Sequence, residues 1–279
     1  MGQRQPRFAL NHMTAPRLNL NDFFGLAREL NIDAVEIRND LAGSAILDGT
    51  SAEQVKVAAA VAGLSILSIN ALQLFNIWNA ARREEAVELA DYAAAAGAKA
   101  LVLVPLNDGT NRGDDERQAN LRNALTALKP ILAERGLTGL VEPLGFSICS
   151  LWLKSEAAAG IDAVDGAATF KLVHDTFHHH LAGEGAIFPA RTGLVHISGV
   201  DDPAVSVADM RDSHRVLVDG RDRLGNIAQI RALLAGGYDG PLSFEPFAAS
   251  VQALDHDAVK AAISESVRLI REELLATAN

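Results

Sequence analysis

Four ionisable residues interrupt or end short apolar runs, where an uncompensated charge is costly: Glu142, Asp175, His196 and Glu245. Three carboxylates and one imidazole suit a single divalent metal ion, Mn²⁺, Mg²⁺ or Zn²⁺, and the lack of thiolates argues against a structural zinc site. A bound cation would also relieve the repulsion between crowded carboxylates. A single charged residue at the end of a strand is more often a hydrogen-bonded group than a metal ligand. Such residues at the ends of four successive apolar runs predict a metal site.

The stretch "KLVHDTFHHHLAG", residues 171–183, holds four of the eight histidines around one aspartate. Asp175 is the ligand candidate, because it ends an apolar run and points inward. Alternation along a strand turns His174 the other way, toward a helical layer. We expect His178 to lie in the loop over the site, within reach of a substrate. His179 and His180 are expected to form the solvated start of a helix.

Eight short apolar, β-rich runs recur along the chain, and most are nearly continuous, as in strands buried on both faces of a parallel sheet. They span 7–11, 34–38, 64–70, 100–106, 138–144, 170–176, 193–198 and 241–247. The alternation of strands with helical segments predicts a single (β/α)₈ TIM barrel over residues 1–279. An open doubly wound sheet is the alternative, but no glycine-rich nucleotide motif follows any run. In a barrel, the carboxyl ends of the strands meet at one mouth, which is where the four ligand candidates would gather.

The helical segments carry recognisable start and stop residues. Ser51 and Gly63 bound one helix, and Asn or Asp begins the segment 19–31. Pro130 is expected to kink or divide the long segment 114–136. The region after the sixth strand, residues 178–191, has the weakest helical pattern.

The composition narrows the class of protein. Of 279 residues 49% are hydrophobic, and the net charge of −10 argues against a nucleic-acid partner. The lone Cys149 excludes an internal disulfide and indicates a reducing compartment. The first residues contain no apolar signal segment, and no apolar run reaches membrane-spanning length. We therefore expect a cytoplasmic protein that has no membrane partner.

Several motifs resemble those of one family. They are "VEIRND" (35–40), "LSINALQLFN" (67–76), "LVLVPL" (101–106), "HDTFHHHLAG" (174–183), "VHISGVDD" (195–202) and "HRVLVDGRD" (214–222). Together they resemble the xylose-isomerase-like TIM-barrel superfamily of sugar isomerases and epimerases, and within it most closely the 2-keto-myo-inositol isomerase (inosose isomerase) family. The resemblance implies Glu, Asp, His and Glu metal ligands at the ends of strands five to eight. These map onto the four residues identified above.

The resemblance implies an isomerase or epimerase that moves a carbonyl on a cyclitol or ketose, with 2-keto-myo-inositol favoured, through an enediolate. Glu142 and Glu245 would act as acid and base, and His178 would bind a substrate oxygen. Arg215 is a further substrate-binding candidate, although a solvated loop charge is an equal reading. Ser198–Gly199 and Arg221–Asp222 depart from the family pattern and leave the substrate open.

Other residues at strand ends have both a substrate-binding and a packing interpretation. These are Asn11, His12, Glu36 and Asn70, with Gln73, Phe75 and Trp78 as a proposed pocket wall. The family suggests a monomer or a homodimer.

Three alternatives remain for the function. A dehydratase acting on an inosose or a dehydroshikimate would share the metal and the proton abstraction but eliminate a hydroxyl. An endonuclease IV-like enzyme would need extra His and Asp ligands and a basic groove. A non-catalytic sugar- or metal-binding barrel would not need both glutamates.

Overall fold

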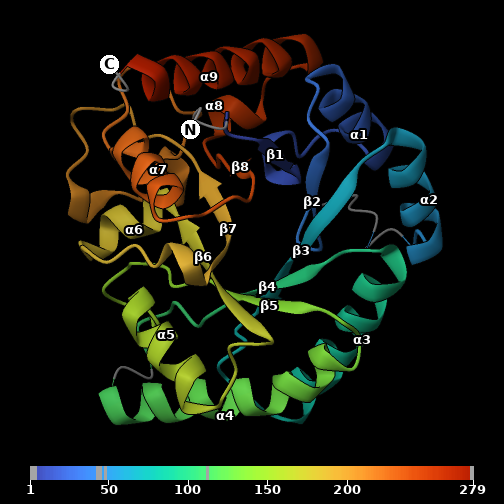
Figure 1. Cartoon of the computed structure of the whole chain (residues 1–279), viewed down its shortest axis with the longest axis vertical. Coiled ribbons are helices and arrows are strands. Elements are labelled where there is room, and N and C mark those ends of the chain that lie inside the picture. Colours follow the sequence, from blue (N-terminus) through green and yellow to red (C-terminus); the bar gives the residue numbers. More distant parts are fainter. Residues whose placement is uncertain (1–4, 42–45, 47–48, 111–112, 277–279) are drawn as a thin grey trace.

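The computed structural model describes residues 5–41, 46, 49–110 and 113–276. Within these ranges, eight parallel strands pair in chain order and close into a barrel, and the helices surround them (Figure 1). The strands are β1 Phe8–Asn11, β2 Ala34–Arg38, β3 Ser65–Gln73, β4 Ala100–Val104, β5 Thr138–Val141, β6 Phe170–Asp175, β7 Thr192–Ile197 and β8 Leu242–Phe244. The predicted TIM barrel is confirmed.

The helices follow the strands around the outside of the barrel (Figure 1). They are α1 Leu20–Glu29, α2 Ala52–Ala62, α3 Ala80–Ala96, α4 Asp114–Ala133, α5 Lys154–Ala163, α6 Thr176–Ala182, α7 Asn226–Ala235, α8 Ala249–Gln252 and α9 His256–Ala276. No helix in these described ranges is long and apolar enough to cross a membrane.

The predicted helix boundaries rest on capping chemistry that the structure shows directly. The Ser51 side chain accepts from the backbone N–H of Gln54, whose own side chain accepts from the backbone of Ser51, so α2 begins with a capping box. Gly63 ends the same helix in the left-handed conformation, which glycine adopts without steric cost. Asn19 caps α1 through the backbone N–H of Asp22.

The structure rules out a division of the segment 114–136 at Pro130, and it shortens two of the predicted strands. Helix α4 runs through Pro130 without division, because the proline lies in its last turn and the helix ends at Ala133. Strands β5 and β8 are shorter than the apolar runs that predicted them. Glu142 and Glu245 each follow the last paired residue and precede a proline, Pro143 and Pro246, which lacks the N–H that a ladder needs.

Alternation along the strands separates two apolar layers. On β4, Leu101 and Leu103 belong to the large core between strands and helices, whereas Ala100 and Val102 belong to a smaller cluster. That smaller cluster also includes Leu140, Val173 and Leu194, and it lies inside the barrel. Two residues beyond each of these three, on the same inward face, come Glu142, Asp175 and His196.

Candidate metal centre

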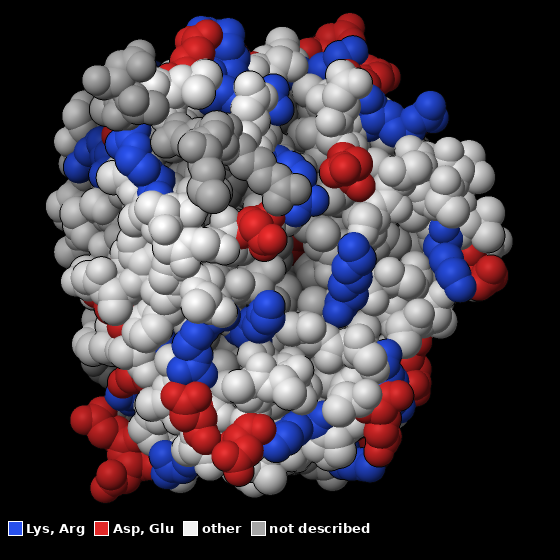
Figure 2. Space-filling view, in the orientation of Figure 1, with Lys and Arg blue, Asp and Glu red and all other residues white. Residues whose placement is uncertain are grey.

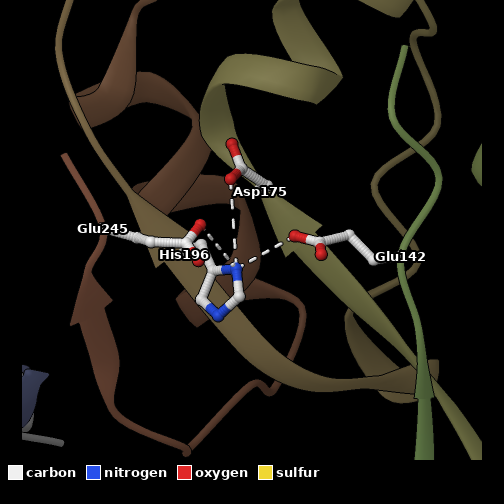
Figure 3. Close-up of side chains that lie close together, drawn as sticks. All are labelled: Glu142, Asp175, His196 and Glu245. Atoms are coloured by element: carbon white, nitrogen blue, oxygen red, sulfur yellow. Dashed lines mark hydrogen bonds and ion pairs between the residues drawn. The ribbon is translucent and has the colours of Figure 1, made fainter. Parts of the chain in front are cut away.

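The four predicted ligands converge at the carboxyl ends of neighbouring strands β5, β6, β7 and β8. Their side chains point toward one another (Figure 3), and one ligand atom from each lies within 4.8 Å of all the others. All four residues are buried: Glu142, Asp175, His196 and Glu245. The structure therefore gathers residues that are up to 103 positions apart (245 minus 142) into one cluster.

The geometry fits a single divalent ion. Two atoms that each lie about 2.2 Å from the same ion can be at most about 4.4 Å apart. The Nδ1 atom of His196 lies 3.0 Å from Glu142 Oε1, 3.2 Å from Glu245 Oε2 and 3.9 Å from Asp175 Oδ2. These three separations satisfy that limit, whereas the four ligand atoms together lie within 4.8 Å of one another, so a small inward movement of the carboxylates would complete the site.

The other nitrogen of His196 faces Glu36, which belongs to β2 on the opposite side of the barrel. Nε2 lies 3.1 Å from Glu36 Oε1, and because an ionised carboxylate can only accept, Nε2 carries the proton. Nδ1 lies 3.0 Å from the Glu142 carboxylate, so without a metal ion it carries a proton as well and donates to Glu142. A bound metal ion would displace that proton, and the contact of Nε2 with Glu36 would keep Nδ1 as the ligand atom. Ser68, Asn70 and Ser243 donate three more hydrogen bonds to the Glu36 carboxylate. Burial opposes ionisation of Glu36, but His196 and the hydroxyl groups of Ser243 and Ser68 outweigh it and hold its pKa at about 2.

The electrostatics of the cluster favour positive charge at its centre. Burial alone would lower the pKa of His196, but Glu245, Glu36 and Glu142 raise it well above the usual value. Burial raises the pKa of Glu245, and Glu142 adds to that rise, while His196 and Arg215 oppose it. A divalent cation would neutralise the same surplus of negative charge.

Arg215 lies closer to the candidate metal ligands than its prediction as a substrate contact implied. It is 1% exposed, and Nη2 donates to Asp175 Oδ2 at 2.5 Å and to Glu245 Oε2 at 3.0 Å. Its guanidinium also lies over the ring of Phe247, 4.6 Å from the centroid. The reading as a solvated loop charge is therefore wrong. Burial opposes the ionisation of Asp175, but Arg215 outweighs it and helps to hold the pKa at about 2.

Arg38 is a site residue that the sequence reasoning missed. Its Nη1 donates to Glu245 Oε1 at 2.8 Å and to Asn11 Oδ1, while Nε and Nη2 form a fork on Asp40. The spacing held a signal: Arg38 follows Glu36 by two residues, so both face the barrel interior.

The remaining strand-end candidates divide into two groups. Asn11 donates to Glu245 Oε1 at 3.1 Å and Asn70 donates to Glu36 Oε2 at 2.8 Å, so both orient residues of the cluster. His12 lies outside it, because its Nε2 lies 2.9 Å from the backbone oxygen of Leu18 and its ring stacks on Phe23.

The predicted pocket wall is only partly supported. Phe75 is fully buried in the core between strands and helices, so it packs rather than lines a pocket. Trp78 and Gln73 are half-buried, and Trp78 packs against the same core. His178 lies in the first turn of α6 and not, as expected, in a loop. It is 5% exposed, and its Nδ1 finds no hydrogen-bond partner among the described residues. The ring of His178 packs edge-on against Phe146 and Phe177.

The three remaining histidines of the stretch divide as follows. His174 points into the helical layer as predicted, where Nε2 contacts Gln229 of α7 at 2.9 Å. His179 is half-buried rather than fully solvated, and its Nδ1 lies 2.7 Å from Nζ of the buried Lys154. His180 is half-buried in α6, and not fully solvated either.

Comparisons with known proteins agree with this architecture. Residues 24–273 match the family model described as xylose isomerase-like TIM barrel. A xylose isomerase domain protein from Salmonella typhimurium LT2 is 34% identical over 97% of this chain and 99% of its own, with a TM-score of 0.88. No curated protein matches the chain.

Two more distant structures share the fold. The IolI protein, solved with a bound zinc atom, is 22% identical over 96% of this chain and 99% of its own, with a TM-score of 0.85. D-psicose 3-epimerase from Clostridium cellulolyticum H10, solved with D-tagatose, is 14% identical over the same shares, with a TM-score of 0.74. The family match covers most of the sequence and the Salmonella protein aligns over nearly all of it; the chain belongs to the xylose isomerase-like TIM barrel family.

Proposed function

We propose that this protein is a divalent-metal-dependent isomerase or epimerase that moves a carbonyl on a cyclitol or ketose, with 2-keto-myo-inositol as the favoured substrate. The observation that carries the proposal is the buried cluster of Glu142, Asp175, His196 and Glu245 at the barrel mouth. A zinc-containing IolI structure and a sugar epimerase with the same fold support it. The metal is Mn²⁺, Mg²⁺ or Zn²⁺, held by these four side chains.

The reaction needs a base, an acid and stabilisation of negative charge on oxygen. A bound divalent cation would supply Lewis-acid stabilisation of that charge. One of the two glutamates removes the proton from the carbon beside the carbonyl. In an isomerisation the other glutamate returns a proton to the former carbonyl carbon, and the hydroxyl proton of the neighbouring carbon passes to the former carbonyl oxygen. In an epimerisation the proton returns to the opposite face of the same carbon.

The two glutamates have different surroundings, as opposite roles require. Glu245 accepts from Arg38, Arg215 and Asn11, which hold both of its oxygens in place. The hydrogen bonds described for Glu142 place His196 at one of its oxygens. Glu142 is therefore the less constrained of the two.

An uncharged substrate fits the site better than a phosphorylated one. The guanidinium of Arg38 already spans Asp40, Asn11 and Glu245, and that of Arg215 already contacts Asp175 and Glu245. Neither guanidinium group is oriented to donate two parallel hydrogen bonds to a substrate phosphate. His178, with an unused ring nitrogen, is our choice to bind a substrate hydroxyl.

Proton NMR in D₂O tests the proposal. Metal-loaded protein is incubated with 2-keto-myo-inositol, and separately with common ketohexoses. Deuterium entering beside the carbonyl, together with a new ketone isomer, is the expected result, and Glu142→Gln and Glu245→Gln should both abolish it. An alkene or diketone product would show a dehydratase instead. Absence of exchange with every substrate would overturn the proposed activity.

A further inference from the structure

A buried lysine lies close to the metal cluster without touching it. Lys154 begins α5, and its side chain is 4% exposed. Its Nζ lies 3.0 Å from His174 Nδ1 and 2.7 Å from His179 Nδ1. The amine therefore joins the end of β6 to the middle of α6.

The hydrogen-bond network fixes the direction of these contacts. Gln229 uses its amide N–H groups on the backbone oxygens of Thr176 and Leu224, so its own oxygen must accept from His174 Nε2. His174 therefore carries its proton on Nε2, and its Nδ1 accepts. Lys154 is the donor, and an amine has enough protons to donate to both histidines whether it is charged or neutral.

A second connection runs between the same two helices. The carboxylate of Glu184, just after α6, accepts from the backbone N–H groups of Lys154 and Ser155, at 3.0 and 2.9 Å. The start of α5 and the segment 174–184 are thus joined twice, once through the Lys154 side chain and once through Glu184.

The residues between the two histidines include a metal ligand and the proposed substrate contact. Asp175 Oδ1 accepts from the backbone N–H groups of Phe177 and His178, in the first turn of α6. This contact leaves Asp175 Oδ2 for the cluster. Because α6 has only seven residues, it is too short to be stable without packing, and its orientation depends on what holds it.

We propose that Lys154 is a positioning residue for the metal centre. Its amine, held between His174 and His179, fixes the turn from β6 to α6 and so fixes the direction of Asp175 Oδ2 and of the His178 ring. The inference rests on the proposed metal centre, but not on the identity of the substrate. Residues outside the ligand set that orient ligands typically contribute about 10- to 100-fold to metal affinity.

Metal binding by Lys154→Met tests the proposal directly. Isothermal titration of metal-free full-length protein with Mn²⁺ should give an affinity about tenfold weaker than wild type. Lys129→Met is the matched control, since Lys129 Nζ also joins two segments, through the backbone oxygens of Val164 and Asp165, away from the cluster. That variant should bind Mn²⁺ like wild type, even if it is less stable.

A second readout separates positioning from general stability. The visible absorption of Co²⁺ bound to Lys154→Met should differ in shape from that of wild type, because the ligand geometry changes. His179→Leu should show the same change, and adding it to Lys154→Met should weaken Mn²⁺ binding less than the two separate losses combined. Lys154→Arg, which keeps donors, should recover part of the affinity.

Affinity and Co²⁺ spectrum of Lys154→Met equal to those of wild type would overturn the proposal. A loss of affinity in Lys129→Met as large as that in Lys154→Met would also overturn it, because a general loss of stability would then explain both. Intact metal binding in wild type with no deuterium exchange would contradict the proposed reaction and leave the role of Lys154 standing.

Discussion

At the scale of single residues, the two nitrogens of His196 have different partners. Nδ1 faces the three ligand carboxylates, and Nε2 faces Glu36, whose oxygens also accept from Ser68, Asn70 and Ser243. In every described hydrogen bond of Glu36 the partner is the donor, so Glu36 must be the acceptor. A carboxylate supplies two accepting oxygens, whereas an amide would turn an N–H₂ group toward one set of these donors.

Glu36→Gln should therefore weaken metal binding by about 10- to 100-fold, although Glu36 is not a ligand. Loss of the negative charge also removes the preference for a proton on Nε2. Titration calorimetry with Mn²⁺ measures the effect, and Glu29→Gln serves as the control because Glu29 is exposed and pairs with Lys260. Equal affinities of Glu36→Gln and wild type would show that Glu36 does not orient His196.

Lys154 also gives the stability a defined pH dependence. Burial lowers the pKa of Lys154 to about 7, while nearby Glu184 and Asp175 oppose the shift. Below about pH 7 both the folded and the unfolded chain carry the proton. Between about 7 and the ordinary value of 10.5, the unfolded chain binds more protons, so the unfolding free energy rises with pH.

The unfolding free energy of wild type should thus increase relative to that of Lys154→Met between about pH 7 and pH 10. Urea denaturation of both proteins at several pH values measures this difference, and the titration of groups away from Lys154 cancels in it. A difference that stays constant or falls over this range would contradict the lowered pKa.

The convergence of the four candidate ligands was predictable from the sequence, whereas the residues that hold them in place were mostly not. Glu142, Asp175, His196 and Glu245 interrupt apolar runs, and that interruption is visible without a structure. Lys154 gave no such signal, because a lysine at the start of a helix is normally solvated. Its burial depends on two histidines at positions 174 and 179, and only tertiary packing brings them to it.

At the scale of elements, the loop after β5 packs directly against α6. Gly145 has φ +68°, and a Cβ at this position would overlap the backbone oxygen of His178. Gly183 at the end of α6 has a similar φ of +62°, but a Cβ there would meet nothing within 4 Å. The two glycines share the same backbone requirement and differ only in steric surroundings.

Gly145→Ala should lower the unfolding free energy more than Gly183→Ala. Both variants lose about 1 to 2 kcal/mol to the left-handed conformation, and Gly145→Ala loses about 1 to 3 kcal/mol more through overpacking against α6. Denaturant unfolding measures both. Because α6 follows Asp175 directly, only Gly145→Ala should also weaken metal binding; equal losses in the two variants would refute the close contact.

Element boundaries were predictable where local chemistry sets them. Ser51 and Gly63 bound α2 as expected, since capping acts within a few residues. The ends of β5 and β8 were placed too late because an apolar run continues past the last paired residue. The prolines after Glu142 and Glu245 were the available signal, and they stop the ladder just where the glutamates leave it.

At the scale of the whole molecule, the charge distribution argues against a nucleic-acid substrate. The net charge is −10, and Figure 2 shows acidic and basic side chains mixed over the visible face, without a continuous basic stripe. Duplex DNA with an abasic site should therefore show no binding at physiological salt in a fluorescence anisotropy assay. Salt-dependent binding with cleavage would instead favour an endonuclease.

Metal binding should raise the stability of the barrel, because the cluster joins the ends of four strands through three carboxylates and one imidazole, and the carboxylates repel one another without a cation. A ligand at about 100 times its dissociation constant adds about 2.7 kcal/mol to the unfolding free energy. For a chain of this size that corresponds to a rise in Tm of roughly 5 to 10 °C. Differential scanning calorimetry of chelator-treated protein, with and without added Mn²⁺, measures the rise.

The variant Glu142→Gln separates binding from repulsion. Removing one carboxylate lowers the repulsion, so metal-free Glu142→Gln should melt at or above the temperature of metal-free wild type. The same variant should gain little from added Mn²⁺, because it lacks a charged ligand. This pattern would show that the cluster costs stability in the free protein and is retained for the cation that it binds, as expected of a functional site. If metal-free Glu142→Gln melts well below wild type, the hydrogen bond of Glu142 to His196 stabilises the free barrel more than crowding of the carboxylates destabilises it.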